Sequence, residues 1–276
     1  MPEEAPEIYR SKRLWIKDPN RWVCRSQWHR ARKFLGQLLK IYEGRGIDSI
    51  CQQPQTVEAS DPLEELPLAL SRDYGDYQPR KGELLKRGRA RFERLVEFWR
   101  AGPWVKETAI GDSEVVFVDG RQLRLGSTEI RFSRPLFHGL EYTGLGWVIG
   151  LVVEYQGAKV LYTSDLQGPT IEDYAQWIIR EDPSFLVVDG PPTYIFGFMV
   201  NRLNLERSIE NMVNILNHTS AETVIYDHHL LRESRFRERT GRVWQLAARR
   251  GKRLVTAAEL LGQEPLILSL AREGRF

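Results

Sequence analysis

Three apolar runs in this sequence each end in an aspartate. They are 158–163 followed by Ser164-Asp165, 185–188 followed by Asp189, and 223–226 followed by Asp227. Short runs of β-branched and aromatic residues that stop at Ser, Asp, Gly or Pro predict buried strands. Layered α/β folds build their sites at the carboxyl ends of such strands. We therefore expect acidic side chains to gather at one edge of a sheet.

Composition sets the class of protein. With 276 residues and 42% hydrophobic content, the chain can bury the core of one large domain. Its 40 basic and 37 acidic residues are too evenly balanced to imply a polyanionic partner. Cys24 and Cys51 cannot form a disulfide framework or a cysteine-rich zinc site. The sequence shows neither a leader nor a membrane-spanning run, so we expect a cytoplasmic protein without a membrane role.

Two stretches interrupt the regular patterns of a single domain spanning 1–276. Residues 44–82 lose periodicity and gain Gln, Pro, Asp and Ser, which predicts an irregular insertion or lid. Residues 83–100 form a basic amphipathic pattern, most simply a helix with a solvated outer face. Contact with nucleic acid or phosphate is the weaker alternative. An earlier amphipathic helix is expected to begin at Ser26 as its cap.

The middle of the chain is typical of antiparallel strands. Asp119-Gly120 between 115–118 and 121–125 indicates a tight hairpin, and Gln156-Gly157 indicates another between 147–155 and 158–163. Strands and helices then alternate. Thr170 opens a helix with a capping-box-like sequence, and Thr256 opens another with Glu259 at the capping-box position. The pattern predicts a layered α/β sandwich.

A histidine pair follows the third strand. His228 and His229 come directly after Asp227, where two imidazoles reduce stability unless they have partners. A metal ion is the most economical partner, and in strand-like geometry only one of the pair need reach it while the other packs or hydrogen-bonds. Asp165 and the loop residue His138 would complete a nitrogen and oxygen set suited to zinc, iron or manganese. The alternative for His138 is a polar turn residue.

Four motifs occur together in a fixed order. They are Pro135-Leu136-Phe137-His138-Gly139, Thr163-Ser164-Asp165-Leu166-Gln167-Gly168-Pro169, Asp189-Gly190-Pro191-Pro192-Thr193-Tyr194 and Asp227-His228-His229-Leu230-Leu231-Arg232. This set resembles a prokaryotic branch of the metallo-β-lactamase-like hydrolase superfamily. The resemblance covers residues from about 105 to 262 and is specific because all four motifs appear in the family's order.

The resemblance implies an α/β fold, the αββα sandwich, with two metal ions at one edge of its sheets. By resemblance His138 is a ligand of the first metal, Asp165 bridges both, and His229, rather than His228, is a ligand of the second. Two zinc ions are implied, with iron or manganese as alternatives. Such a pair of metal ions lowers the pKa of a shared water toward about 7 and so produces a hydroxide nucleophile. Asp165 would fix the separation of the two ions, and the resemblance therefore implies that it is a catalytic residue.

Other polar residues of these motifs are expected around the ligands. Thr193 and Tyr194 follow a stiff Pro-Pro turn and are expected to contact substrate or hydrogen-bond the ligands. The structural alternative is that this loop only reverses the direction of the chain. Asp189 and Asp227 are expected to orient a ligand histidine in the same way.

The sequence departs from the family pattern at one point. The family's His-x-His-x-Asp-His motif is absent, and the strands that precede the counterpart of Tyr9–Asp18 are absent as well. The chain therefore resembles the family without its first part, and we expect a sandwich that is incomplete at the N-terminus. A shortened chain, a second chain that supplies the motif, and a degenerate relative each account for this.

Two functions follow from these expectations. The first is a metal-dependent hydrolase acting on an ester or phosphoester bond of a small-molecule or phosphoester substrate. The second is a non-catalytic binding or scaffold subunit with the same fold. It would meet a partner chain, or a second copy of itself, through an exposed sheet edge.

Overall fold

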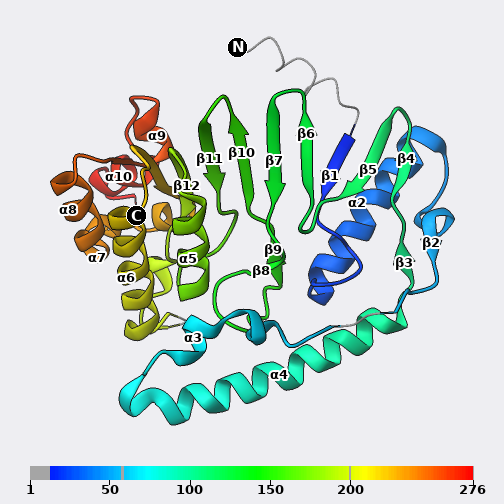
Figure 1. Ribbon diagram of the computed structural model, residues 1–276, viewed down its shortest axis with the longest axis horizontal. Helices are drawn as coiled ribbons and strands as arrows, with labels where there is room; N and C mark the ends of the chain where they lie inside the picture. Colours follow the sequence, from blue (N-terminus) through cyan, green and yellow to red (C-terminus); the bar gives the residue numbers. More distant parts are fainter. Residues whose placement is uncertain (1–12, 57–58, 199, 276) are drawn as a thin grey trace. The chain divides into compact units, whose positions relative to one another are not determined.

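The computed structural model describes residues 13–56, 59–198 and 200–275 (Figure 1). This part of the chain divides into two compact units. Among the described residues, unit 1 consists of 13–56, 59–64, 73–137 and 141–149, and unit 2 consists of 65–72, 138–140, 150–198 and 200–275. The fold class is α/β, as the sequence predicts. The single domain expected from the sequence stays a prediction.

Unit 1 combines short strands with two long helices. Its strands are β1 (Arg13–Ile16), β2 (Cys51–Gln52), β3 (Trp104–Val105), β4 (Thr108–Ile110), β5 (Ser113–Phe117), β6 (Gln122–Leu125), β7 (Thr128–Phe132), β8 (Leu136–Phe137) and β9 (Trp147–Val148). Its helices are α2 (Arg25–Glu43) and α4 (Gln78–Ala101), with 3-10 turns at Ile47–Ile50, Pro62–Glu65 and Gly75–Tyr77. β1 pairs in parallel with β5, which pairs with β4 in antiparallel.

The apolar stripe of α2 packs on this small sheet. Leu35 and Leu39 are fully buried against Val115 of β5 and Ile110 of β4. The helix begins at Arg25, because the side chain of Gln27 accepts a hydrogen bond from the backbone N–H of Cys24 at 3.1 Å. The predicted cap at Ser26 is therefore wrong.

The Asp119-Gly120 turn has a different role from the predicted one. β5 and β6 lie on either side of it but do not pair, since β5 pairs with β1 and β4 while β6 pairs with β7. The carboxylate of Asp119 instead accepts hydrogen bonds from Nζ of Lys17 and the backbone N–H of Asp18, at 3.0 and 2.6 Å. The predicted hairpin is wrong because this carboxylate binds the chain that leaves β1.

Residues 44–82 contain short elements rather than one irregular loop. They hold β2, three 3-10 turns and α3 (Pro67–Ser71), and α4 begins inside the range at Gln78. The insertion therefore ends at residue 77, five residues before its predicted end at residue 82. None of the helices in the described part of the chain combines the length and apolar composition that crossing a bilayer requires.

Unit 2 alternates strands and helices. Its strands are β10 (Leu151–Tyr155), β11 (Ala158–Tyr162), β12 (Phe185–Asp189), β13 (Thr223–Asp227) and β14 (Arg253–Val255). Its helices are α3, α5 (Glu172–Glu181), α6 (Arg202–His218), α7 (Phe236–Arg239), α8 (Gly241–Arg249), α9 (Ala257–Leu260) and α10 (Leu266–Arg272), with 3-10 turns at Thr193–Ile195 and His228–Arg232. The strand order is β14-β13-β12-β11-β10, and only the β10–β11 pair is antiparallel.

One face of this sheet carries the main core of unit 2. Alternate residues such as Leu161, Leu186 and Val224 are fully buried, and they pack with the apolar sides of α5, α6 and α8. In Figure 1, α5 lies next to β12, and α6 lies beside α5. The predicted β10–β11 hairpin at Gln156-Gly157 is confirmed, with both residues at positive φ.

The first turn of α5 differs from the predicted capping box. The helix begins at Glu172, and no side chain caps it. The acidic residues of the predicted motif make tertiary contacts instead. Glu172 accepts two hydrogen bonds from the fully buried guanidinium of Arg207, and Asp173 accepts from the backbone of α3. At the other predicted box, Glu259 and Thr256 cap each other as expected.

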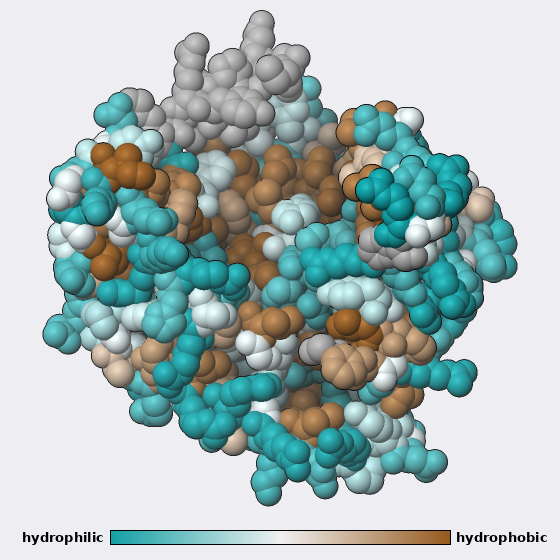
Figure 2. All heavy atoms as spheres, turned by 180° about the vertical axis from the view of Figure 1, so that it is seen from behind, coloured by the Kyte–Doolittle hydropathy of each residue, from teal (hydrophilic) through white to brown (hydrophobic). Residues whose placement is uncertain are grey.

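The opposite face of the sheet is also apolar but more open. Val160 and Tyr162 alternate with buried Leu161 along β11 and are 39% and 47% exposed. Val153 and Val187 on the neighbouring strands are half-buried. Figure 2, seen from the side opposite to Figure 1, shows hydrophobic atoms at the molecular surface. Both faces of β11 therefore carry apolar side chains.

Candidate metal centre

Parallel pairing brings the ends of three strands to one edge of the unit 2 sheet. Asp189 ends β12 and lies opposite Asp227, which ends β13. Asp165 follows β11, and the backbone N–H of Thr163 before it donates to Val187 of β12. The three aspartates that the sequence predicts to share an edge do so. His228 and His229 leave the same edge in a 3-10 turn that begins directly after β13.

Three histidines surround the carboxylate of Asp165. Nε2 of His138 lies 2.9 Å from its Oδ2, Nδ1 of His229 lies 3.2 Å from its Oδ1, and Nε2 of His228 lies 3.6 Å from its Oδ2. One ligand atom each from Asp165, Asp189, His228 and His229 lie within 4.8 Å of one another. The structure therefore brings together all four residues that the sequence assigns to the metal, and it adds Asp189.

Asp189 organises the turn around the cluster. Its carboxylate is buried, and it accepts hydrogen bonds from the backbone N–H of Gln167 at 2.6 Å and of His229 at 3.2 Å. The same carboxylate lies 3.0 Å from Nδ1 of His229. Asp189 therefore fixes both the position of His229 and the orientation of its ring.

The two carboxyl groups have opposite pKa shifts. Burial raises the pKa of Asp189, and Asp165 raises it further, against the lowering effect of His229. Burial would also raise the pKa of Asp165, but His138, Asp189 and His229 together outweigh it and hold that pKa well below its usual range. Of the two carboxyl groups, Asp165 therefore loses its proton more readily, and it is the one that faces all three imidazoles.

Two atoms of the cluster test its fit to a metal ion. Nε2 of His138 and Oδ1 of Asp165 are buried, yet neither forms a hydrogen bond with any of the described residues. Nε2 of His138 approaches Oδ2 of Asp165 closely, but the contact does not have hydrogen-bond geometry. Buried polar atoms without a partner are rare and costly. Nitrogen and oxygen donors that converge without bonding one another suit a shared divalent cation. The residues present therefore fit such an ion.

The backbone around the cluster is strained. Ser164, Gln167 and His228 have φ values of 61°, 53° and 60°, in the left-handed region that non-glycine residues avoid. Close packing also requires Gly190 beside Asp189, because a Cβ there would lie 2.2 Å from the side chain of Leu230. Strained residues beside converging polar side chains are typical of functional sites.

The other predicted residues divide into two groups. The ring of Tyr194 stacks in parallel on His229, with centroids 6.3 Å apart, and its hydroxyl accepts a hydrogen bond from Arg232 at 3.0 Å. Thr193 is buried and its hydroxyl has no hydrogen-bond partner within the described residues. Asp227, in contrast, binds the backbone N–H groups of His228 and Ala257, both at 2.5 Å. Its expected contact with a ligand histidine side chain is absent among the described hydrogen bonds.

Sequence reasoning did not find two contributors to the site. Arg232 lies at the end of the 3-10 turn that carries both histidines, and its guanidinium lies over the Tyr194 ring at 5.4 Å. Gln167 supplies the N–H that binds Asp189. Both residues lie inside recognised motifs, Gln167 in the second and Arg232 in the fourth, and that position was a usable signal.

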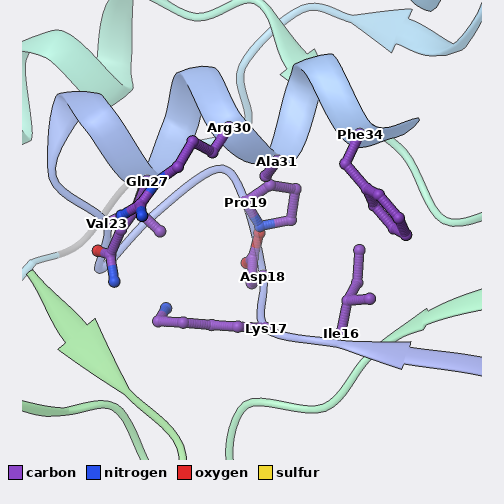
Figure 3. A pocket seen from close by; sticks show the side chains of 9 residues that line it. All are labelled: Ile16, Lys17, Asp18, Pro19, Val23, Gln27, Arg30, Ala31 and Phe34. Atoms are coloured by element: carbon purple, nitrogen blue, oxygen red, sulfur yellow. The ribbon is translucent and has the colours of Figure 1, made fainter. Parts of the chain in front are cut away.

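A separate cavity of about 240 Å³ lies in unit 1 between the end of β1 and α2 (Figure 3). Its lining is largely apolar and includes Ile16 and Phe34. Lys17 also lines this cavity, and burial lowers the pKa of its amino group, although Asp119 opposes that shift. The amide of Gln27 already bonds both the N–H and the C=O of Trp147. This cavity therefore lacks the converging free donors that distinguish the edge of the unit 2 sheet.

No protein-family model matches this chain. The chain is 36% identical over 157 residues to the UPF0282 protein of Methanopyrus kandleri, covering 57% of this chain and 52% of that relative. It is 35% identical over 163 residues to the UPF0282 protein of Metallosphaera sedula, covering 59% and 52%. The UPF0282 protein of Korarchaeum cryptofilum is 36% identical over 163 residues, covering 59% and 54%. The chain thus spans about half the length of the curated relatives it matches.

Solved structures show weaker likeness. CmlA, a diiron beta-hydroxylase from Streptomyces venezuelae, is 13% identical with a TM-score of 0.35, covering 53% of this chain and 34% of that chain. A score this low carries no argument about the present chain. The comparisons therefore place it beside the UPF0282 proteins by sequence similarity over more than half of its own length.

Proposed function

We propose that this chain binds a divalent metal ion at the edge of the unit 2 sheet and hydrolyses an ester or phosphoester bond. The observation that carries the proposal is the pair of buried, unbonded atoms, Nε2 of His138 and Oδ1 of Asp165, which converge beside His229. Asp165, Asp189, His228 and His229 would hold the ion, with His138, whose Nε2 lies 2.9 Å from Oδ2 of Asp165, as a further donor. When bound, such an ion polarises a substrate oxygen and lowers the pKa of water.

The chain's own residues have separate tasks in this proposal. Asp165 places negative charge at the centre of the three imidazoles, so it both attracts the cation and sets where it lies. Asp189 keeps the ring of His229 oriented. Tyr194 covers one face of that ring, and Arg232 adds a positive charge next to it, where an anionic part of a substrate would be stabilised. Imidazole and carboxylate donors suit zinc, iron or manganese alike.

The resemblance to metallo-β-lactamase-like hydrolases supports a site for two ions. This sequence contains no His-x-His-x-Asp-His motif, so ligands for a complete two-metal site would come from another polypeptide segment. We propose that the cluster alone holds one ion. A partner chain that supplies the missing ligands would then be needed for full activity.

Elemental analysis of the purified chain tests metal binding. We expect about one zinc, iron or manganese ion per chain, and less than a tenth of that in Asp165→Ala and His229→Ala. His218→Ala is the matched control, because His218 ends α6 and, in the part of the chain that the structure describes, its ring bonds only the C=O of Asn214. Its metal content should equal that of the unmodified chain.

Hydrolysis is measured in parallel with p-nitrophenyl acetate and bis(p-nitrophenyl) phosphate. Activity that follows metal content across the variants supports the proposal. An unmodified chain that stays metal-free after dialysis against zinc, iron and manganese would exclude it for this polypeptide.

The open face of the unit 2 sheet favours a second candidate function. Val160 and Tyr162 expose apolar surface that a scaffold subunit would use to bind a protein partner. A chain that binds metal but hydrolyses neither compound, and that purifies in a stable complex, would favour this function over catalysis.

A further inference from the structure

Positive charge is concentrated on two helices of unit 1. α2 contains five lysines and arginines against one glutamate, and α4 contains eight against three. The two helices therefore have a net charge of +9, whereas the whole chain has +3. The remainder must have a net charge of −6. The balanced overall composition thus conceals a strongly basic part of the molecule.

The arginines of α4 share one side of the helix. Arg80, Arg87, Arg91 and Arg94 follow one another at intervals of seven, four and three residues, which places them on a single face. All four are exposed. At 1.5 Å per residue they span about 21 Å along the helix. The opposite side of α4, with Phe92, Val96 and Trp99, is buried in unit 1.

Aromatic contacts extend this row onto α2. Phe98 lies one turn beyond Arg94, and the guanidinium of Arg25 lies 4.6 Å above its ring. Phe98 also contacts Trp28, with ring centroids 5.3 Å apart, and Arg32 lies 4.6 Å above the Trp28 ring. We call the six residues Arg80, Arg87, Arg91, Arg94, Arg25 and Arg32 the arginine row.

Several members of the arginine row have no acidic partner. Arg80 pairs with Glu83, Arg32 pairs with Asp48 at 3.9 Å, and Arg91 donates to the C=O of Tyr142. Within the described residues no carboxylate forms an ion pair with Arg25, Arg87 or Arg94. Exposed basic side chains are often only solvated. A single helical face with repeated unpaired guanidinium groups is different, because it presents a regular line of positive charge.

We propose that the arginine row binds the phosphodiester backbone of a nucleic acid. Guanidinium groups bind phosphate oxygens in a bidentate manner, and α4 uses six arginines but only two lysines. Arginines interleaved with aromatic rings are typical of surfaces that bind single strands. An anionic membrane is the less suitable partner, because the apolar side of α4 is buried and cannot enter a bilayer.

Fluorescence anisotropy with labelled 20-nucleotide RNA and DNA tests the proposal. The titrations contain EDTA and run from 50 to 200 mM KCl, so they do not depend on the proposed metal site. We expect the intact chain to bind, with an affinity that falls steeply with salt. Arg87→Glu with Arg94→Glu should weaken binding at least tenfold and reduce the salt slope by about two.

The control is Arg202→Glu with Arg249→Glu, two exposed arginines of unit 2 on α6 and α8. It changes the net charge by the same amount and should leave binding unchanged. If circular dichroism shows that the α4 variant is unfolded, Arg87→Gln with Arg94→Gln replaces it. The relative affinities for RNA and DNA identify the source of the phosphodiester.

Three results would overturn the proposal. The first is that the intact chain binds neither oligonucleotide at 50 mM KCl. The second is that both double variants weaken binding equally, which would mean that only net charge matters. The third is equal or tighter binding to vesicles with 30% phosphatidylglycerol, measured by co-sedimentation, which would identify a membrane instead.

Discussion

Two aspartates at the same level of the sheet have different roles. Asp189 and Asp227 are register partners at the ends of β12 and β13. Asp189 faces the histidine cluster, whereas the carboxylate of Asp227 binds the backbone where the 3-10 turn and α9 begin. Both strands end in the same residue type, so the sequence alone could not separate these roles. The difference depends on how the chain turns after each strand.

Asp189→Asn should weaken metal binding without unfolding the chain. The amide keeps the shape of the carboxylate but loses the charge that orients His229, so the dissociation constant should rise by about 10- to 100-fold. Isothermal titration with zinc measures this. Asp227→Asn is the control, with unchanged zinc affinity and a stability loss of about 1 kcal/mol from its weakened cap. Equal effects of the two variants on zinc affinity would contradict the separation of roles.

Sequence reasoning located the site better than it assigned its members. The four motifs placed His138, Asp165, His228 and His229 together, and the structure brings them within contact distance. The role of Asp189 as a possible ligand required the three-dimensional arrangement, because its carboxylate reaches the cluster only across the neighbouring strand. Arg232 lies in the fourth motif, but its contact with Tyr194, 38 residues earlier in the chain, depends on the three-dimensional arrangement.

At the scale of the element, α4 contains two glycines in very different surroundings. A Cβ on Gly82 would meet no atom within 4 Å, whereas one on Gly88 would lie 2.5 Å from the side chain of Tyr142. Gly82→Ala should therefore stabilise unit 1 by about 0.5–1 kcal/mol. Gly88→Ala should destabilise it by about 1–3 kcal/mol through overpacking, despite the better helix former.

Urea unfolding followed by tryptophan fluorescence measures both variants. The two changes are identical in chemistry and lie on one helix, so only packing differs between them. Stabilisation by both would show that Tyr142 does not press against α4.

The capping box of α9 predicts a pH dependence. Burial opposes ionisation of Glu259, but its hydrogen bonds to Thr256 and the charge of Arg237 lower its pKa below the ordinary 4.5. A carboxyl group with a lowered pKa stabilises the fold fully above pH 4.5, and this contribution is lost as pH falls through the folded-state pKa. Glu259→Gln should therefore be less stable than the unmodified chain at pH 6, and the difference should shrink toward pH 3.

Unfolding free energies of both chains at several pH values test this sign. Glu264→Gln, which removes an exposed ion pair with Arg272, is the control. A difference that grows as the pH falls would mean that the charge of Glu259 does not stabilise the cap.

The predicted elements failed where tertiary contacts replaced local ones. Asp119-Gly120 has the sequence of a hairpin turn, yet Lys17, about a hundred residues earlier, binds its carboxylate. Glu172 and Asp173 have the sequence of a capping box, yet a buried arginine and the backbone of α3 use them. Local propensity predicted the helices and strands themselves, since hydrophobic periodicity is a property of the segment. It could not predict which partner each polar side chain would find.

At the scale of the whole molecule, the unit 2 sheet has apolar residues on both faces, but helices cover only one of them closely. Val160→Lys with Tyr162→Lys should reduce binding of the dye ANS and change the unfolding free energy by less than about 1 kcal/mol. Leu161→Ala, between them on the covered face, should cost about 2–5 kcal/mol. Unchanged ANS fluorescence in the lysine variant would show that this face is not the exposed apolar surface.

The sequence predicted the α/β class and the edge at which the aspartates meet, because both depend on strand periodicity and on the rule for parallel strand ends. It did not predict two compact units. That division depends on which segments contact one another, and residues 65–72 and 138–140 belong to unit 2 although their neighbours along the chain belong to unit 1. No local pattern marks these exchanges.

The left-handed residues around the cluster have a consequence for how the molecule opens. Ser164, Gln167 and His228 each hold a conformation that costs an L-residue about 1 kcal/mol. The adjacent strands, with Leu161, Leu186 and Val224 fully buried, have no such cost. Local unfolding should therefore begin at this edge while the strands of the sheet stay paired. The histidines would then separate from one another before the core is exposed to solvent. The metal site can therefore be lost while the rest of the fold stays intact.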